Sequence, residues 1–445
     1  MPCRVLRTSL PSVRELLRRA PKRLEVEHVT TLLSVEDPND VAEVIQRADA
    51  LRREQTGDAV SFVINRNINF TNACIKRCGF CAFSRTPRGM HKSETYYLPL
   101  EEIARRAREA RDLGATEVCV QAGLPPGASA DLYTRVASCI KEAVPNIHLH
   151  AFSPEEVLYG AQLRGVTTNE YLKLLRDAGV DSLPGTAAEI LVQEIRDKIS
   201  PGRITVSQWI RIAKEARLSA GLRMTATVMF GHVETPAHIA RHLLTIRALQ
   251  HEVGVFTEFV PLGFVHWEAP MCREHDPRYL AECRDGPSPA QRLLVHAVSR
   301  IVLGDCIRNI QCSWPKESPE GTIRLLQAGC NDLGGTLMNE SISSAAGAKH
   351  GQVMTPREMR RIATAAGPER YLIQRDTLYN ILHREPSCAL DEYAGTKGNL
   401  RFGSFHELLK SNRFRFHDAL RSETANGTSR NRSTWVRSRA PDAVQ

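Results

Sequence analysis

No segment of this sequence is apolar for long enough to cross a bilayer. A membrane-spanning helix needs about 20 mostly apolar residues, and the 445 residues contain no run of about 18 or more. The N-terminus also lacks the apolar segment of a secretory signal peptide, although it is rich in arginine. We therefore expect a cytoplasmic protein without a membrane partner. Organellar targeting by the Arg-rich N-terminus is the alternative.

The positive charge of the chain is confined to its two ends. The net charge is +9, but residues 1–23 hold seven basic side chains against one acidic, and residues 411–445 hold seven against three. The body between these ends is therefore close to neutral. A nucleic-acid-binding domain usually carries a basic patch or stripe, so we expect no nucleic-acid partner. A near-neutral body suits small polar substrates.

The twelve cysteines do not form the pattern of a disulfide scaffold. Most are scattered along a long chain, and only residues 74–81 hold a dense cluster. Disulfide scaffolds are typical of small secreted domains, whereas clustered cysteines in a reducing cytosol usually indicate metal binding or catalysis. The cluster is therefore the strongest candidate for a functional site.

The sequence also lacks the G-x-G-x-x-G fingerprint of a dinucleotide-binding sheet. From about residue 100, amphipathic helices alternate with short apolar runs, usually through a glycine. This alternation predicts βαβ units, and eight strands predict an α/β protein with a (β/α)8 TIM-like barrel. An open doubly wound sheet is the alternative. The predicted strands are residues 62–70, 116–122, 147–152, 180–183, 222–230, 255–261, 309–314 and 331–335.

We expect helical extensions at both ends of the barrel. The predicted parts are a basic N-terminal extension over residues 1–27, a helical lead-in over 28–60, the barrel over 61–355, a helical C-terminal cap over 356–411 and a basic tail over 412–445. The tail is rich in Ser, Thr, Asn and Arg and has little to bury, which is typical of disorder.

Three cysteines lie close together directly after the first predicted strand. Cys74, Cys78 and Cys81 have the spacing C-x3-C-x2-C, with no fourth cysteine nearby. In a barrel this loop lies on the C-terminal rim, where catalytic groups are found. A [4Fe–4S] cluster usually has four Cys ligands. Three ligands would leave one iron open, as a catalytic metal site requires.

Two other interpretations of this loop stay open. A structural zinc site prefers four protein ligands, and His91 is the nearest candidate for the fourth; the chain would then be a zinc-dependent binding module. Chance clustering of free cysteines is the second. The place of the loop after the first strand, with the aromatic Phe80 before the last cysteine, favours the iron–sulfur interpretation.

The loop resembles that of the radical S-adenosylmethionine (SAM) superfamily, whose signature is three cysteines after the first barrel strand. The resemblance implies that the amino and carboxylate groups of SAM chelate the open iron of the cluster. One electron from a reducing donor then cleaves SAM and yields a 5′-deoxyadenosyl radical. A closed barrel would shield such a radical from water and side reactions.

Six longer strings are similar to the tyrosine-using branch of the 7,8-didemethyl-8-hydroxy-5-deazariboflavin (FO) synthase family. The resemblance implies that the radical takes a hydrogen atom from L-tyrosine and that the Cα–Cβ bond of tyrosine breaks. The 4-hydroxybenzyl group then joins C5 of 5-amino-6-(D-ribitylamino)uracil, and 2-iminoacetate is left. Because this chain has one cysteine loop, a separate radical SAM FO synthase subunit would act next in coenzyme F420 biosynthesis. The strings are residues 65–85 (NRNINFTNACIKRCGFCAFSR), 148–156 (HLHAFSPEE), 182–191 (SLPGTAAEIL), 225–235 (TATVMFGHVET), 257–269 (TEFVPLGFVHWEA) and 331–348 (NDLGGTLMNESISSAAGA).

The same resemblance implies roles for residues near the predicted strand ends, but it names no catalytic side chain. The cluster ligands would be Cys74, Cys78 and Cys81. The candidates beside the cluster and SAM are Phe80, Gln121, Gly123, Glu189, Gly231 and Glu234. The candidates for the tyrosine and uracil pockets are His266, Glu268, Gln311, Ser313 and Trp314. Structural roles stay open too, because His266 and Trp314 could pack under a loop and Glu234 could cap the helix near Thr235.

Two related enzyme classes share much of this signature. A radical SAM enzyme of the futalosine route to menaquinone shares the fold and most of the SAM strings, but residues 331–339 and 257–269 favour the tyrosine-using branch. An RNA-modifying radical SAM enzyme is the other alternative, because both ends of the chain are basic.

Overall fold

The protein is described by a computed structural model over residues 11–87, 94–273, 282–383 and 388–416. His91 lies outside these ranges, so the structure does not address its predicted role as a fourth zinc ligand. Most of the predicted disordered tail also lies outside them, because the described part of the chain ends at residue 416.

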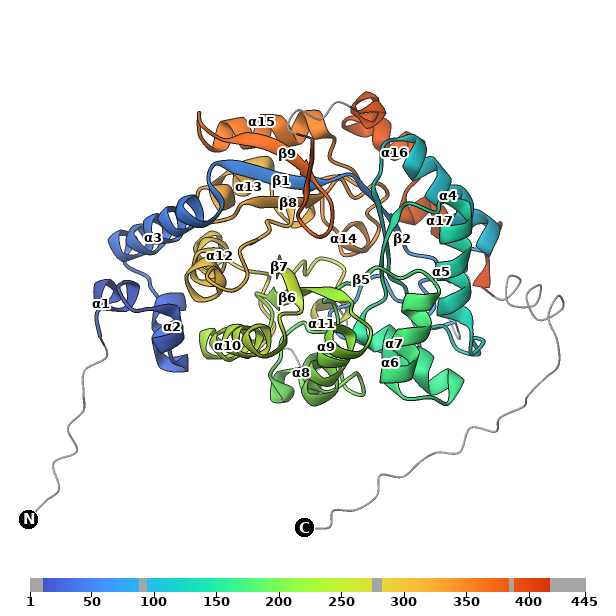
Figure 1. The fold of residues 1–445 in the computed structure, drawn as a ribbon, viewed down its shortest axis with the longest axis horizontal. Coiled ribbons are helices and arrows are strands. Elements are labelled where there is room, and N and C mark those ends of the chain that lie inside the picture. Colours follow the sequence, from blue (N-terminus) through green and yellow to red (C-terminus); the bar gives the residue numbers. More distant parts are fainter. Residues whose placement is uncertain (1–10, 88–93, 274–281, 384–387, 417–445) are drawn as a thin grey trace, which may run out of the picture.

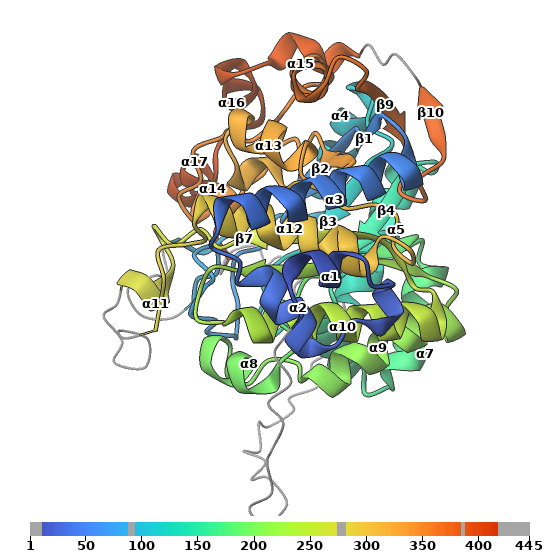
Figure 2. The ribbon, with the colours of Figure 1, turned by 90° about the vertical axis from the view of Figure 1, so that its left-hand side faces the viewer.

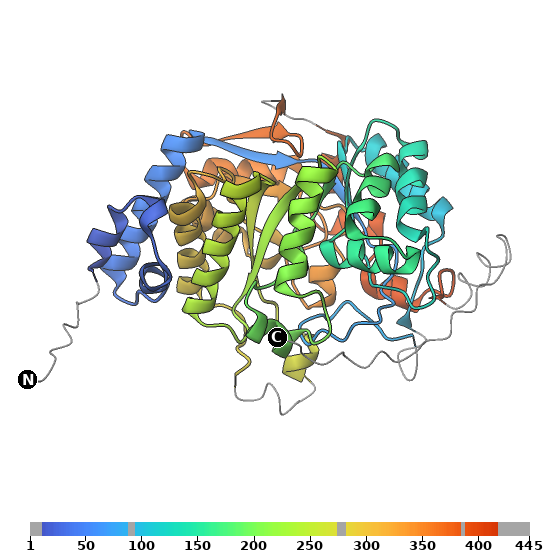
Figure 3. The same cartoon turned by 60° about the horizontal axis from the view of Figure 1, so that its bottom comes forward.

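Six parallel strands form one curved sheet at the centre of the molecule (Figure 1). In order of pairing they are β2 (Asn65–Ile68), β3 (Glu117–Val120), β4 (His148–Ala151), β5 (Ser182–Leu183), β6 (Arg223–Phe230) and β7 (Phe256–Gly263). Isolated bridges continue the curve. Phe259 bridges Ile310, Gln311 bridges Asp332 of β8 (Asp332–Gly335), and Arg66 of β2 bridges Met338. These bridges close the curve into a barrel, with helices packed around it (Figure 3).

A second, four-stranded sheet continues the barrel wall. Its order is β10 (Ile381–His383), β9 (Tyr371–Arg375), β1 (Ala59–Val63) and β8. β9 lies parallel to β1, and β10 is antiparallel to β9. Because β1 leads into β2 through Ile64, one extended segment belongs to both sheets.

Amphipathic helices cover the outside of the strands. α4 (Leu100–Asp112) shows why: Ile103, Ala107 and Ala110 repeat at helical spacing and are buried, while most of its charged side chains lie on other faces. The other helices that follow the first strands are α5 (Leu132–Ala143), α6 (Pro154–Arg164), α7 (Thr168–Asp177), α8 (Gln193–Ile199), α9 (Val206–Ser219), α10 (Pro236–Val253), α11 (Pro270–Arg273), α12 (Pro289–Leu303), α13 (Pro319–Leu326), α14 (Ile342–Ala345), α15 (Pro356–Ala366), α16 (Thr396–Phe402) and α17 (Phe405–Lys410).

The N-terminal extension packs against the barrel's outer helices. α2 (Val26–Leu33) packs against α10 and α12, α3 (Pro38–Thr56) packs along α12, and α1 (Val13–Leu17) packs on α2 and α3 (Figure 2). None of the described helices is both long enough and apolar enough to cross a membrane.

The predicted α/β barrel with helical extensions is confirmed, but three predicted segments differ. The strand over 62–70 is split into β1 and β2, because the chain changes strand partners at Ile64. Residues 309–314 make only isolated bridges, and a 3-10 turn begins at Trp314. The segment 356–411 is not wholly helical, since it contains β9 and β10; the buried Leu372 and Ile373 sit in a run too short to separate strand from helix by its periodicity.

Candidate functional site

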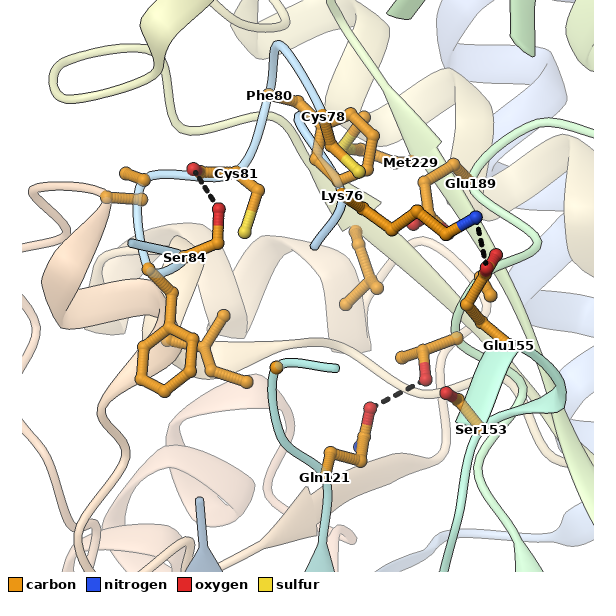
Figure 4. Close-up of a pocket in the computed structure, with 18 of the residues that line it drawn as sticks. Lys76, Cys78, Phe80, Cys81, Ser84, Gln121, Ser153, Glu155, Glu189 and Met229 are labelled. Atoms are coloured by element: carbon orange, nitrogen blue, oxygen red, sulfur yellow. Dashed lines mark hydrogen bonds and ion pairs between the residues drawn. The ribbon is translucent and has the colours of Figure 1, made fainter. Parts of the chain in front are cut away.

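The three clustered cysteines line one cavity of about 260 Å³ at the mouth of the barrel (Figure 4). Their loop follows β2 and is fixed by backbone hydrogen bonds: Cys74 N–H donates to Arg85 O (3.0 Å), and Gly79 N–H donates to Ile199 O (2.8 Å). Burial raises the pKa of the Cys78 thiol to about 12. A cation bound between the sulfurs would favour the thiolates. Three sulfurs facing one cavity fit an iron–sulfur cluster with an open iron.

The floor of this cavity is the end of β3 and the turn that follows it. Gln121 and Gly123 both line the cavity. Gly123 N–H donates to Thr71 O (2.9 Å), which ties the turn to the chain just before the cysteine loop. A Cβ atom at Gly123 would lie 2.4 Å from the carbonyl oxygen of Ala73. The close approach of two backbones therefore requires glycine here.

We expect Gly123→Ala to displace the cysteine loop. The added methyl group meets backbone rather than a flexible side chain, and overpacking of this kind costs about 1–3 kcal/mol. Thermal unfolding and the iron retained after cluster reconstitution measure the two effects. Gly321→Ala is the matched control, because Gly321 has no positive φ and a Cβ there would meet only side-chain atoms of Glu317 and Ser318, at 3.3 Å and beyond. Equal iron loss in both variants would contradict the proposed contact.

Charged side chains form a buried network on one wall of the cavity. Arg203 pairs with Glu189 and with Glu155 (Nε to Oε2, 3.4 Å), and its guanidinium lies 5.7 Å from the ring centre of Phe80. Lys76 Nζ lies 3.3 Å from Glu155 Oε1. Phe80 and Glu189, two of the residues predicted to bind the cofactor, both line the cavity, and Arg203 contacts both of them.

Glu156 closes the same wall from the start of α6. Its carboxylate accepts hydrogen bonds from Ser153 N–H (2.8 Å) and from Ala122 N–H (3.0 Å), so it links β3 to the helix cap. Burial nevertheless raises its pKa from 4.5 to about 7, because desolvation of the carboxylate outweighs these bonds.

We expect Glu156 to make the stability of the protein fall as the pH rises from about 4.5 to about 7. The folded state binds the proton of Glu156 more tightly than the unfolded state, so its stabilising effect is present below pH 4.5 and is lost as the pH rises through 7. Glu156→Gln should reduce this slope, by on the order of 1–3 kcal/mol over the window. Denaturant unfolding at several pH values measures it; an unchanged slope would contradict the shift.

A second cavity, of about 230 Å³, lies inside the barrel and adjoins the first. The predicted residues Gln311 and Ser313 line it, together with polar side chains from β2, β3, β4, β6 and β7. Residues shared by both linings form the boundary between the two cavities: Gln121, Thr186, Thr227, Leu262, Lys316, Ile342 and Ser343.

Five predicted residues do not line either cavity. Glu234 accepts from Gly231 N–H (2.8 Å) and pairs with Arg284, so both residues shape the turn after β6. The N-terminus of α10 is capped by Thr235 and His238 instead. The others are His266, which packs 4.2 Å from Trp267 between ring centres, Glu268, which pairs with Arg273, and Trp314, which is buried and donates to Gly335 O at 2.9 Å.

Several residues that line the cavities were not predicted from the sequence. Glu155 and Glu156 lie in the string 148–156, shortly after β4. Their position near a strand end could have identified them as candidates. Lys316 and Arg375 were not at predicted strand ends. Lys316 follows the irregular segment before the 3-10 turn, and Arg375 belongs to β9, a segment that was predicted to be helical.

A closed barrel with a three-cysteine loop after its first strand defines a radical SAM protein. Residues 68–246 match the family model of the radical SAM superfamily, and residues 258–382 match that of the CofH/MqnC C-terminal region. The superfamily uses a [4Fe–4S] cluster and SAM, for which the cysteine-lined cavity is suited. Two solved structures agree in fold: the hydrogenase maturase HydG (16% identity, 94% of this chain and 93% of that chain, TM-score 0.62) and methylornithine synthase PylB (17% identity, 77% and 88%, TM-score 0.54).

Comparison with relatives that are more than 40% identical shows which family within the superfamily the chain belongs to. The chain is 43% identical to the 5-amino-6-(D-ribitylamino)uracil–L-tyrosine 4-hydroxyphenyl transferase of Methanocaldococcus jannaschii, over 80% of this chain and 97% of the relative. It is 42% identical to the FO synthase of Mycobacterium tuberculosis, over 83% of this chain but only 44% of that protein. The chain belongs to the family of 5-amino-6-(D-ribitylamino)uracil–L-tyrosine 4-hydroxyphenyl transferases.

Proposed function

We propose that the protein joins the 4-hydroxybenzyl group of L-tyrosine to 5-amino-6-(D-ribitylamino)uracil and releases 2-iminoacetate, as a step in FO formation. The observation that carries this proposal is the pair of adjoining cavities inside one barrel, one lined by three cysteines and the other by polar side chains. The names of its relatives supply the substrates. The description CofH/MqnC covers two groups of proteins and does not by itself choose between them.

In this proposal Cys74, Cys78 and Cys81 hold the cluster, and SAM binds in the same cavity. When bound, the cluster and SAM would supply the one-electron chemistry that removes a hydrogen atom from tyrosine. Phe80, Gln121, Gly123 and Glu189 line the cavity and would position SAM. Gly231 and Glu234 would act only by shaping the turn after β6.

Lys316 is the residue that we expect to bind the tyrosine carboxylate. It lines both cavities, its Nζ donates to Ser343 Oγ (2.6 Å), and it has no ion-pair partner among the described residues. Burial lowers the pKa of this ammonium and the charges of Glu340 and Glu317 only partly offset that effect, so a ligand carboxylate in direct contact would stabilise the charged form. Tyrosine held there would lie at the boundary between the cluster side and the deep cavity.

Lys316→Met should therefore raise the KM for tyrosine by about 10–100-fold, the loss expected for one hydrogen bond to a charged group. Steady-state adduct formation with varied tyrosine measures this. Lys214→Met is the control, because Lys214 pairs with Glu252 at the surface. A KM for tyrosine that does not change in Lys316→Met would contradict the role.

The proposed reaction is tested with anaerobic, cluster-loaded protein, a reductant, SAM, tyrosine and 5-amino-6-(D-ribitylamino)uracil. We expect 5′-deoxyadenosine together with an adduct that carries the tyrosine ring, identified by mass spectrometry. Formation of 5′-deoxyadenosine without any tyrosine-derived adduct would overturn the assignment of the substrates.

The partners are part of the same proposal. The FO synthase of Mycobacterium tuberculosis extends well beyond the matched region, because the match covers 44% of its length. We propose that a second radical SAM FO synthase unit takes up the adduct and that a reducing electron donor serves the cluster. Cytoplasmic localisation is supported by cysteines that are free throughout the described residues.

A further inference from the structure

The deep cavity has a different chemical character from the cysteine-lined one. Its walls carry three carboxylates, Glu117, Glu258 and Glu340, and many amide and hydroxyl groups. The guanidinium of Arg375 is engaged by Glu258 (Nη2 to Oε2, 3.1 Å) and by Asp332 (Nε to Oδ2, 2.8 Å). Among the described lining residues, hydrogen-bond acceptors therefore dominate, and the cation without an ion-pair partner, Lys316, lies at the boundary with the first cavity.

Two buried acceptors of this cavity accept no hydrogen bond from the described residues. Asn67 and Asn69 line it and are 8% and 6% exposed, and the Oδ1 atom of each lacks a hydrogen-bond partner among the described residues. The amide nitrogens are already used, by Glu340 for Asn67 and by the carbonyl of Gln121 for Asn69 (2.8 Å). Buried polar groups are normally hydrogen-bonded, so these two oxygens indicate a ligand that donates.

The side-chain amide of Gln311 also lines this cavity. Its amide lies over β8, where a Cβ at Gly334 would approach Gln311 Nε2 to 2.2 Å, so glycine makes room for it. No hydrogen bond joins this amide to another described residue. The amide groups of Asn67, Asn69 and Gln311 therefore all line this cavity.

We infer that the deep cavity is the subsite for the polyol chain of the uracil substrate, with the pyrimidine ring directed toward the cysteine-lined cavity. A polyol is uncharged and carries a donor on every hydroxyl group, which matches a pocket rich in acceptors, where Arg375 is already paired and Lys316 is assigned to tyrosine. The reacting C5 of the pyrimidine would then face tyrosine at the boundary formed by Lys316. This inference rests on the proposed function and assigns one part of one substrate to one cavity.

The test is a binding cycle that needs no turnover. Cluster-loaded protein with SAM and no reductant is titrated with 5-amino-6-(D-ribitylamino)uracil and with 5-amino-6-(methylamino)uracil, which lacks the polyol. We expect wild type to bind the truncated compound at least about 100-fold more weakly, because several hydrogen bonds are lost. Gln311→Leu should weaken binding of the complete substrate about tenfold and leave binding of the truncated compound unchanged.

Gln327→Leu is the matched control, since Gln327 is exposed at the end of α13 and donates to Ala366 O (3.3 Å); it should bind both compounds as wild type does. Equal affinity of wild type for the two uracils would overturn the inference even if Gln311→Leu failed to fold. The inference would also be overturned if Gln311→Leu weakened binding of both uracils by the same factor, or if it changed only the Kd of tyrosine. Absence of any uracil binding and of any adduct would instead overturn the proposed function, and the inference with it.

Discussion

Cys78→Ala should abolish both the iron–sulfur absorbance and the cleavage of SAM. Removal of groups that only support a metal ligand typically costs about 10–100-fold in metal affinity or activity. Loss of one of three ligands should therefore reduce SAM cleavage by on the order of 10³-fold or more. Iron content, visible absorbance and 5′-deoxyadenosine release after anaerobic reconstitution measure the effect.

Cys139→Ala is the control for this experiment. Cys139 is half-buried on α5, away from the cysteine-lined cavity, and its thiol donates only to Leu100 O (3.3 Å). We expect this variant to keep its iron. Full iron loading of Cys78→Ala, or stoichiometric zinc in wild type in place of iron, would contradict the assignment of the ligands.

Arg375→Met should destabilise the fold by about 3–5 kcal/mol, the usual cost of leaving a buried charge unpaired. Arg375 is buried between Glu258 and Asp332, and its side chain is only 3% exposed. Without the guanidinium, two carboxylates face each other in the barrel. The free energy of unfolding in denaturant at pH 7.5 or so, above the raised pKa of about 7 of Glu258, measures the loss.

Arg176→Met provides the comparison. Arg176 pairs with Asp177, but its side chain is 45% exposed, and surface pairs contribute only about 0–1 kcal/mol. A further variant, Arg375→Met combined with Glu258→Gln, should recover part of the loss because one carboxylate is neutralised. Unfolding of Arg375→Met at the wild-type denaturant concentration would show that the buried ion pairs do not support the barrel.

The cysteine loop was predictable because its ligands are contiguous. Cys74, Cys78 and Cys81 occupy eight residues of chain, so spacing alone carries the chemistry. The barrel was predictable for a similar reason, since each βα unit repeats a local pattern of apolar residues. The break at Ile64 was not, because both strands on either side of it are extended and only their partners differ.

The deep cavity could not be predicted from local patterns. Each strand contributes one or two side chains, as Glu117 and Glu258 do, and only the closed barrel brings them together. Strand-end position also does not determine which way a side chain points, because a shift of one residue reverses its face. Gln311 and Trp314 are three residues apart, yet one lines the cavity and the other packs under Gly335.

The pairing of β9 with β1 has a consequence for how the chain avoids association with itself. β1 has β8 on one side, and without β9 its other side would present unpaired N–H and C=O groups, which act as a template for a strand from another molecule. β9 covers that edge, and the edge strand of the sheet is then β10, which is only three residues long. Short edge strands are one of the devices by which sheets resist aggregation. The C-terminal part of the chain therefore protects solubility as well as supplying Arg375 to the barrel.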